Sequence, residues 1–408
     1  MAGTYSRKRV FLISGSRTPI GKFGGSLSRT SVDDLAAHTM TNALRKAGIT
    51  SGTLNGVILG HGYQSPFTPN TARVAAQKAN FASTVPAVTV QRQCGSGMEA
   101  VQLASEKIAL GKAQFMLAGG AESMSTIPYV LPGNLRFEGR MSKIFSWTKF
   151  GPYPTFFAMA DNGIAPAALR KDTKTVFMAK TAQRLADTYG ISREAADEYA
   201  LRSQKLAAKA IAEGRFAEEI DPVLTSRGFF VHDEHPYKKT SMEALAKLKP
   251  VYGMTSITAG NTSGINDAAC SLILASEDAV AAHNLQPLAE IKDWCVAGVD
   301  HEQMGIGPVA AIEKLLAENN LTLDDIDLIE INEAFAAQTL ACVKLLGIDI
   351  NKLNVNGGAI ALGHPIGMSG ARVVHTLAIE LGKRNLKRGI AALCVGGGMG
   401  IATLVERQ

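Results

Sequence analysis

Residues 86–104, PAVTVQRQCGSGMEAVQLA, predict a short strand that turns tightly into a helix. The alternating run at 87–90 is typical of a strand, and helical periodicity begins at Gly97. Cys94 therefore lies in the turn between the two elements. Gly95 and Gly97 allow a tight bend and the close approach of another group. The stretch thus places a thiol at the carboxyl end of a strand, where open α/β sheets bind their ligands.

The position of Cys94 favours chemistry at its sulfur. The first N–H groups of the following helix and the positive end of its dipole point toward the turn, and both stabilise a thiolate. A thiolate is the nucleophilic form of cysteine. A buried structural cysteine beside a glycine turn fits the same residues, so this stretch alone is compatible with either role.

Predicted strands and helices alternate around this stretch. Strands are expected at 10–13, 57–60, 87–90 and 115–118, and helices at 31–46, at 70–80 and from Gly97 onward. Alternating strands and helices usually form a parallel sheet with helices on both faces. We therefore predict an α/β fold.

The same order of elements returns late in the chain. Strands are expected at 289–291, 328–331, 353–355 and 391–394, the last being the closing strand, and helices at 307–320, 333–346 and 369–381. Short sequence motifs also recur, since Ser96-Gly97-Met98 is similar to Ser369-Gly370-Ala371. The repeat predicts an internal duplication at a spacing of roughly 270 residues, with two related α/β halves packed face to face.

A segment of different composition separates the two halves. Residues 124–174 are rich in Pro, Gly, Phe and Met and predict an extended loop region, and helices are expected at 176–190 and 192–214. The segment 121–250 holds 19 Lys and Arg against 15 Asp and Glu. It therefore suits either an attractor for an anionic ligand or an ordinary solvated surface. A lid, a binding surface and an oligomerisation loop are all compatible with its length.

Composition excludes several classes of protein. The 408 residues are 46% hydrophobic and 19% charged, as in ordinary soluble α/β proteins, and no apolar run reaches the length of a membrane span. Five scattered cysteines form no C-x-x-C pair and no zinc-ligand spacing, which favours free thiols in a reducing compartment. We expect the cytoplasm, with an organelle matrix as the alternative. The net charge of +6 is interleaved with acids, which argues against nucleic-acid binding.

Four clusters of reactive or glycine-rich residues follow predicted strands: Cys94, and the segments 331–335, 356–365 and 394–400. His364, in a loop too glycine-rich for ordinary core packing, could deprotonate Cys94. Cys394 could accept and return a proton, or could simply end a buried strand. Asn332 could orient a water or donate to an oxyanion, or could cap the following helix.

The chain resembles the thiolase family in four motifs: QCGSG at 93–97, NEAFA at 332–336, GGAIALGHPIGMSGAR at 357–372 and CVGGG at 394–398. The resemblance also includes SRTP at 16–19 and AGNTSGIND at 259–267, so it covers nearly the whole chain. It implies the thiolase fold, in which two duplicated α/β halves form a five-layer αβαβα core with an inserted loop domain. The expected boundaries are 1–120 with 251–280 for the N-terminal half, 121–250 for the insertion and 281–408 for the C-terminal half.

The resemblance implies an acyltransferase. Cys94, activated by His364, would be acylated by an acyl-CoA or 3-ketoacyl-CoA, and Cys394 would exchange the α-proton of acetyl-CoA. His364 and a water held by Asn332 would form one oxyanion hole, and backbone amides near Cys94 and Gly396 would form the other. Coenzyme A and acyl-CoA are then substrates, with no bound cofactor and no metal.

The same resemblance implies the substrate contacts. The insertion would receive the phosphates of CoA, and the pantetheine and acyl groups would lie along Ser263, Ala259, Met178, Met304, Ala334, Phe335 and Gly396. It also implies a homotetramer or dimer, and a place in fatty acid metabolism such as β-oxidation.

Two departures from the family pattern bear on the acyl chain. This chain has Phe177-Met178-Ala179 where many short-chain thiolases have His-Met-Gly, and its region 127–175 is longer than the usual loop. A ketosynthase-type condensing enzyme and a catalytically silent acyl-CoA-binding paralogue are the alternatives. Ketosynthases pair their cysteine with two histidines or with His and Asn, whereas Cys394 favours the thiolase; a silent binder would not require two thiols.

Overall fold

The computed structural model describes residues 7–128, 178–251 and 253–407. The long loop expected at 127–175 and Phe177 therefore lie almost wholly outside the described residues. The N-terminal half contains β1 (Val10–Arg17), β2 (Gly21–Lys22), α1 (Val32–Ala47), β3 (Gly56–Gly60), α2 (Thr71–Lys78), β4 (Ala87–Val90), α3 (Ser96–Ala109), β5 (Phe115–Ser123) and β8 (Asn266–Ser276).

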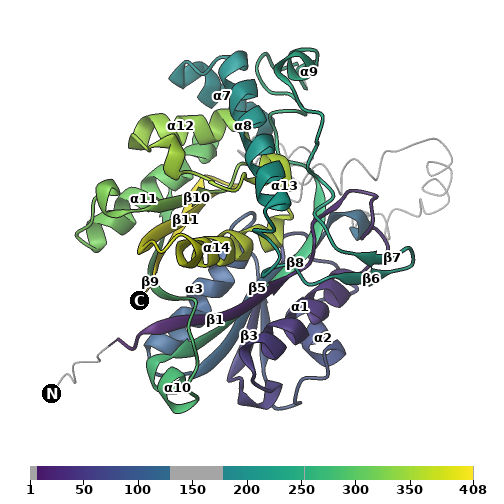
Figure 1. Ribbon diagram of the computed structural model, residues 1–408, viewed down its shortest axis with the longest axis vertical. Coiled ribbons are helices and arrows are strands. Elements are labelled where there is room, and N and C mark those ends of the chain that lie inside the picture. Colours follow the sequence, from purple (N-terminus) through teal and green to yellow (C-terminus); the bar gives the residue numbers. More distant parts are fainter. Residues whose placement is uncertain (1–6, 129–177, 252, 408) are drawn as a thin grey trace, which may run out of the picture.

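The remaining elements form the inserted segment and the C-terminal half (Figure 1). The inserted segment contains α7 (Met178–Tyr189), α8 (Arg193–Ala212), β6 (Val223–Thr225), β7 (Gly228–Phe230) and α9 (Met242–Ala246). Helix α10 (Glu277–Ala282) connects the two halves, and the C-terminal half contains β9 (Ala289–Gly298), α11 (Gly307–Glu318), β10 (Leu328–Ile331), α12 (Ala336–Leu346), α13 (Ala359–Leu362), α14 (Ile366–Lys383), β11 (Arg388–Val395) and β12 (Met399–Glu406).

The two halves share one strand order, which confirms the predicted duplication. The N-terminal half is arranged β4-β3-β5-β8-β1, and the C-terminal half is arranged β10-β11-β12-β9. Leu353 adds an isolated parallel bridge beside Ile329 of β10. Leu353 lies beside β10 in the C-terminal half as β4 lies beside β3 in the N-terminal half, so the two halves have the same spatial order of elements. In both halves the last two strands run antiparallel to their neighbours.

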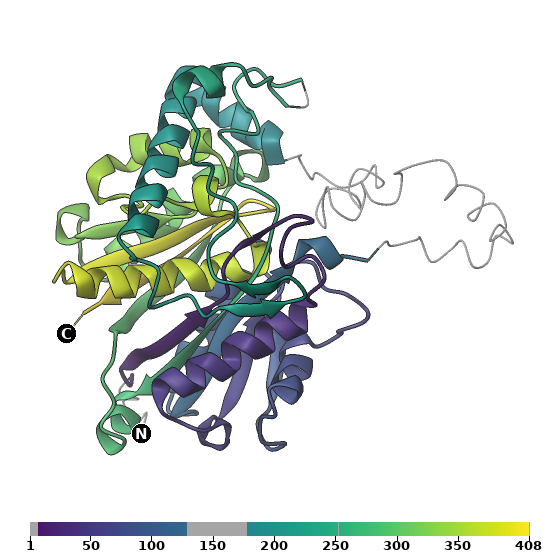
Figure 2. The ribbon, with the colours of Figure 1, turned by 45° about the vertical axis from the view of Figure 1, so that its right-hand side comes forward.

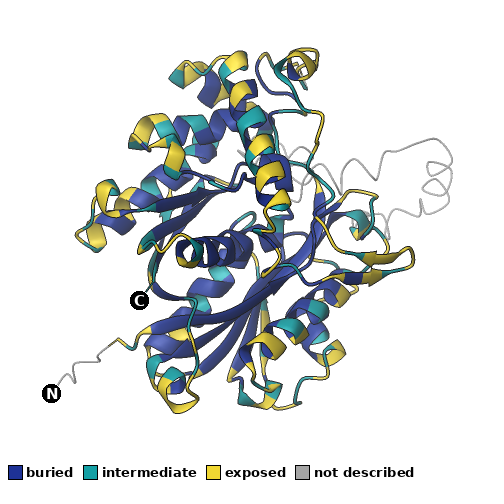
Figure 3. Ribbon diagram, in the orientation of Figure 1, coloured by how far each residue is buried: buried dark blue, intermediate teal, exposed yellow. Residues whose placement is uncertain are grey.

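The halves stack as five layers. Helices α1 and α2 cover the outer face of one sheet, α11 and α12 cover the outer face of the other, and α3 and α14 lie between the sheets (Figure 2). Strands β1 and β9 join the sheets through two residue pairs, Phe11 with Glu290 and Leu12 with Ala289. Every residue of α14 from 367 to 381 is buried, whereas the outer helices expose one face (Figure 3). A helix that is buried on all sides belongs to the centre of a core.

Three expectations about strands were wrong. The sheet is mixed rather than parallel, because β8 returns to the first half between β1 and β5 and pairs antiparallel with both. Residues 391–394 are not in the closing strand, since the three glycines that follow form a turn into β12. A short turn can join only antiparallel strands. Residues 353–355 contribute only the bridge at Leu353.

Buried polar contacts attach the inserted segment to both halves. The guanidinium of Arg17 on β1 is fully buried and lies 2.7 Å from Asp233 and 2.9 Å from Glu219. Glu333, which follows β10, accepts hydrogen bonds from the side chains of Tyr199 (2.9 Å) and Ser203 (2.7 Å) on α8. Breaking such a buried network leaves charges without partners, which is costly, so the insertion is held firmly where it adjoins the core.

Candidate active site

Cys94 lies in the turn that the sequence predicts, half-buried between β4 and α3. Gln93 before it has a φ of +43°, a left-handed conformation that is uncommon for residues other than glycine and typical of functional turns. Helix α3 begins directly after Gly95 without a side-chain cap. A Cβ atom on Gly95 would lie 3.0 Å from Val395 Cγ2, so the turn packs against the end of β11.

The two central helices meet at their first turns, just after Cys94 and His364. They cross at their first turns, where a Cβ atom on Gly97 of α3 would lie 2.7 Å from the carbonyl oxygen of Gly367 on α14. Cys94 and His364 each lie shortly before the first residue of one of these helices. The glycines allow the backbones to touch, so the turn that holds Cys94 and the loop that holds His364 both lie next to this helix crossing.

Hydrogen bonds fix the tautomer of His364. The Ser369 hydroxyl donates to the carbonyl oxygen of Pro365 (2.8 Å), and it lies 2.6 Å from His364 Nδ1. Because its one hydrogen is used, Ser369 accepts from His364 Nδ1–H, and the lone pair is left on Nε2. The Asn332 side-chain amide donates toward this Nε2 over 3.4 Å. His364 is therefore arranged as a base at Nε2.

Burial keeps His364 neutral. Its ring is almost fully enclosed, and desolvation, with a smaller contribution from the Arg372 charge, lowers the pKa of His364 to about 4. A lowered pKa means that the imidazole stays unprotonated until the pH falls to about that value. At neutral pH the ring can therefore accept a proton from Cys94.

Asn332 is completely buried at the end of β10. Its side-chain oxygen has no hydrogen-bond partner among the described residues, and such an acceptor is a natural place for a bound water. The alternative role as a helix cap is wrong, because α12 begins at Ala336 with Phe335 as its N-cap.

Cys394 lies near the end of β11 and is fully buried. Desolvation raises the pKa of Cys394 well above its ordinary value, and the charges of Cys94 and Cys342 raise it further. Cys394 is thus held as a protonated thiol, which suits a proton donor.

An apolar cluster surrounds Cys394 and contains several of the residues predicted to contact substrate. Met304, Ala334 and Phe335 are buried in it, and the partly buried Met178 packs against it. The backbone N–H of Ser263 donates to the carbonyl oxygen of Ala334 (3.1 Å), which places Ser263 at the edge of the cluster.

Two predicted contact residues lie apart from this cluster. Gly396 lies in the turn after β11, where an added Cβ atom would be 3.6 Å from Gln93 Cγ and 3.9 Å from Met178 Sδ. It therefore adjoins the Cys94 turn. Ala259 is exposed on the strand-free segment that leads to Ser263.

Sequence reasoning did not identify the residues that hold His364. Ser369 was seen only as part of a repeated word, although its spacing of five residues from His364 was a usable signal. Asn266, which accepts the backbone N–H of His364 (2.9 Å), comes from β8 far away in sequence. No local pattern predicts such a contact.

Replacing Ser369 tests the tautomer directly. We expect Ser369→Ala to lower kcat/KM by roughly tenfold, because Nδ1–H loses its acceptor and Nε2 no longer carries the lone pair in every molecule. The pH profile of kcat/KM should fall only as pH drops toward 4 in the wild type, where His364 becomes protonated. Thr376→Val, which removes a hydroxyl from the same helix far from the site, is the control. Equal kcat/KM values for Ser369→Ala and wild type would contradict the assignment.

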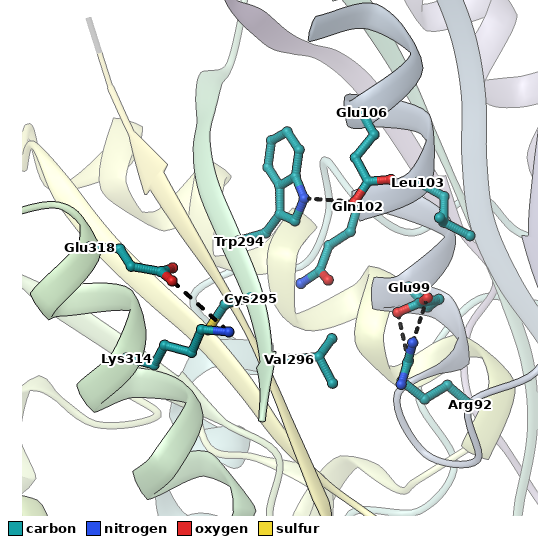
Figure 4. A pocket seen from close by; sticks show the side chains of 10 residues that line it. All are labelled: Arg92, Glu99, Gln102, Leu103, Glu106, Trp294, Cys295, Val296, Lys314 and Glu318. Atoms are coloured by element: carbon teal, nitrogen blue, oxygen red, sulfur yellow. Dashed lines mark hydrogen bonds and ion pairs between the residues drawn. The ribbon is translucent and has the colours of Figure 1, made fainter. Parts of the chain in front are cut away.

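A polar groove of about 310 Å³ lies between α3, β9 and α11 (Figure 4). Arg92 is paired with Glu99, Lys314 with Glu318, and the Trp294 ring nitrogen with Glu106. The groove contains none of the predicted catalytic or substrate residues. Its charged groups are paired with one another, so we do not place the reaction there.

The described residues contain neither a cluster of metal-ligating side chains nor a helix that could span a membrane. No group of three or more His, Cys, Asp or Glu side chains in that part of the chain could hold a metal ion. Within the same residues, no helix has the length and apolar character needed to cross a membrane.

Comparison with known families gives two matches that together span almost the whole sequence. Residues 10–278 match "Thiolase, N-terminal domain", and residues 285–407 match "Thiolase, C-terminal domain".

Individual proteins are similar over the same length. The chain is 45% identical to a β-ketoadipyl-CoA thiolase of Pseudomonas aeruginosa and 44% identical to an acetyl-CoA acetyltransferase of Escherichia coli, each over 98% of this chain and 99% of the relative. The crystal structure of the Bacillus anthracis acetyl-CoA acetyltransferase matches with a TM-score of 0.91 at 42% identity, covering 99% of this chain and 100% of that one. Human mitochondrial 3-ketoacyl-CoA thiolase in complex with CoA matches with a TM-score of 0.90 at 37% identity, covering 98% of both chains.

Proposed function

The chain belongs to the thiolase family, and we propose that Cys94, His364, Asn332 and Cys394 carry its reaction. This reaction is the CoA-dependent cleavage of a 3-ketoacyl-CoA to acetyl-CoA and a shortened acyl-CoA, or the reverse Claisen condensation. The residue assignment is supported by the close approach of the two central helices, which begin just after a half-buried thiol and a neutral histidine. Nothing in the comparisons favours the ketosynthase or the silent binding paralogue.

In the first half-reaction, Cys94 is the nucleophile. His364 Nε2 accepts its proton, and the thiolate attacks the substrate carbonyl carbon. The imidazolium so formed carries a hydrogen on Nε2. Attack at the 3-keto carbon is followed by cleavage of its bond to the α-carbon, which leaves the electron pair on the enolate of acetyl-CoA. The imidazolium can then donate to the thioester oxygen of this enolate, together with a water bound at Asn332. The charge that develops on the oxygen therefore meets donors that are already in position.

Cys394 supplies the proton that carbon–carbon bond cleavage requires. Cleavage releases the enolate of acetyl-CoA, and the Cys394 thiol protonates its α-carbon. In condensation the Cys394 thiolate removes the same proton. The raised pKa of Cys394 supports this role, because a thiol that holds its proton firmly in the resting site is available as an acid, and its thiolate is a strong base.

The substrate proposal rests on the surroundings of Cys394. Met304 and Phe335 are buried in the same apolar cluster as Cys394, so we propose a short neutral acyl group, with acetoacetyl-CoA as the preferred 3-ketoacyl-CoA. A ketoadipyl group ends in a carboxylate, and burying that charge among apolar side chains would be unfavourable. The CoA part of the substrate would extend past Gly396 and Ser263 toward the inserted segment. Its phosphates would meet the basic residues of 121–250.

The remaining proposals concern organisation. We propose the boundaries 1–120 with 251–280, 121–250 and 281–408 for the two halves and the insertion. Strand β4 ends its sheet with Val88 46% exposed. An unpaired edge strand is a template for a second copy, which supports a dimer or homotetramer. The need for two free thiols supports a reducing compartment, which is either the cytoplasm or an organelle matrix. We also propose a role in fatty acid metabolism, such as β-oxidation.

A series of substrates tests the function and the substrate together. We expect thiolysis of 3-ketoacyl-CoA to be fastest at four carbons and to fall by at least tenfold by eight, because longer chains must displace Met304 and Phe335. β-Ketoadipyl-CoA should be cleaved more slowly than the neutral six-carbon substrate. The measurement is the loss of the 3-ketoacyl enolate absorbance on addition of CoA.

The outcomes of this series separate two claims. Rates that rise with chain length, or a preference for β-ketoadipyl-CoA, would overturn the short-chain proposal alone. No cleavage of any substrate, by protein whose fold is intact, would overturn the proposed function.

A further inference from the structure

A buried carboxylate joins the start of α14 to the N-terminal half. Glu122, the last residue but one of β5, is completely buried. Its oxygens accept backbone N–H groups from Gly62 (3.0 Å), Tyr63 (3.2 Å) and Gly367 (2.9 Å), and one oxygen lies 3.3 Å from His61 Nε2. Glu122 thus binds three backbone donors from two segments that are distant in sequence.

Gly367 is the residue at which these segments converge. A Cβ atom placed there would lie 2.5 Å from the carbonyl oxygen of Ala121 and 2.9 Å from His61 Cα. The first turn of α14 therefore rests directly on β5 and on the loop after β3. The N–H groups of a first helical turn have no partners within the helix. Glu122 takes one of them and also faces the positive end of the helix dipole.

The consequence for His364 follows from its distance along the chain. It precedes Gly367 by only three residues, and its own backbone N–H is held by Asn266 on β8. Helix α3, which carries Cys94 at its start, packs on β5 as well. Strand β5 therefore contacts both helices, and Glu122 near its end binds the start of α14, which follows His364.

From this geometry we propose that Glu122 is a positioning residue for the reaction: through Gly367 it sets the place of His364 relative to Cys94. The proposal rests on the catalytic roles proposed above for those two residues. The hydrogen bonds of Glu122 go to backbone N–H groups at the start of α14 and after β3. It acts by holding a helix start, and a displacement of about 1 Å in a catalytic group can lower a rate by on the order of a hundredfold.

Two substitutions at Glu122 test the proposal in the full-length protein. In Glu122→Gln the amide oxygen can still accept from Gly62 and Gly367, whereas Glu122→Ala leaves all three N–H groups without their acceptor. With acetoacetyl-CoA and CoA as substrates, we expect kcat to fall about fivefold in the first variant and about fiftyfold in the second. KM should stay within about twofold in both. The rate of Cys94 alkylation by iodoacetamide should fall in the same order.

Asn55→Ala is the matched control. The Asn55 side chain accepts two backbone N–H groups, from Gln114 and Phe115, where β5 begins. Its removal loosens the opposite end of the same strand, so it should lower the melting temperature while kcat and Cys94 alkylation stay within about twofold of wild type.

The possible results separate this inference from the proposed function. If the wild type is active and both Glu122→Gln and Glu122→Ala have the same kcat as the wild type, the positioning role alone is overturned. The positioning role is also overturned if Asn55→Ala shows the same fall in kcat as the Glu122 variants at the same loss of melting temperature. If Glu122→Ala does not fold, Glu122→Gln decides by the same criterion. An inactive wild type would overturn the proposed function and this inference with it.

Discussion

Cys94→Ser is expected to fold normally and to lose thiolysis by at least about a thousandfold. The serine hydroxyl has a far higher pKa than the thiol, so neutral His364 cannot generate enough of its anion to attack a thioester. Serine adds no bulk to the turn between β4 and α3, so the fold should be unaffected. The measurements are steady-state thiolysis of acetoacetyl-CoA and mass spectrometry of protein quenched in acid.

Cys295→Ser is the control for this substitution. Cys295 is a buried cysteine of β9, and its thiol donates to the carbonyl oxygen of Ala311 (3.0 Å), a bond that a serine hydroxyl can also make. We expect turnover within about twofold of wild type and normal acylation. Turnover at the wild-type rate in Cys94→Ser, or acyl groups found on another residue, would show that the nucleophile is wrongly assigned.

Cys394→Ala is expected to separate the two half-reactions. Acyl transfer from a simple acyl-CoA to Cys94 should continue within about tenfold of wild type, because it needs no α-proton. Condensation and cleavage should fall by roughly a hundred- to ten-thousandfold, the usual range for loss of a general acid or base. The measurements are acyl-Cys94 formation from acetyl-CoA, followed by mass spectrometry, and exchange of the acetyl-CoA α-hydrogens with deuterated water.

Cys342→Ala is the matched control for Cys394. It removes a second buried thiol whose charge would raise the pKa of Cys394, and this thiol donates to the carbonyl oxygen of Gly305 and accepts from the Gln338 amide. It should leave α-hydrogen exchange within a few-fold of wild type. Equal loss of acylation and of exchange in Cys394→Ala would mean that Cys394 supports the site as a whole and has no separate role in proton transfer.

Local patterns in the sequence predicted most of the fold. The helix expected at 31–46 is α1, whose Ser31 cap and Gly48 terminus are both present. The turn at Cys94 was predicted correctly because the glycines and the change of periodicity lie within a few residues of each other. The recurrence of words such as Ser96-Gly97 at Ser369-Gly370 indicated the duplication, and the strand orders confirm it.

Contacts between distant segments could not be predicted in this way. The antiparallel place of β8 depends on how the chain returns after the insertion, and nothing in its apolar sequence gives a direction. Glu122 and Asn266 read as ordinary polar residues near the ends of strands. Their roles arise only when α14 is placed on β5, since that packing brings their oxygens to backbone N–H groups from the other half of the molecule.

The same limit applied to the chemistry of the site. Cys94, His364 and Cys394 were identified because reactive side chains stood next to glycines at strand ends. The neutral state of His364 depends on burial by both halves, and its tautomer depends on Ser369. Neither the neutral state nor the tautomer of His364 can be predicted from the few residues around it in the sequence.

Trapping of the covalent intermediate tests the central claim most directly. Wild-type protein mixed with acetoacetyl-CoA, quenched in acid and digested, should carry one acetyl group on the peptide that contains Cys94. This label should disappear within one turnover when free CoA is added before the quench. An active enzyme that never carries an acyl group on Cys94, or that carries it on another residue, would contradict the account.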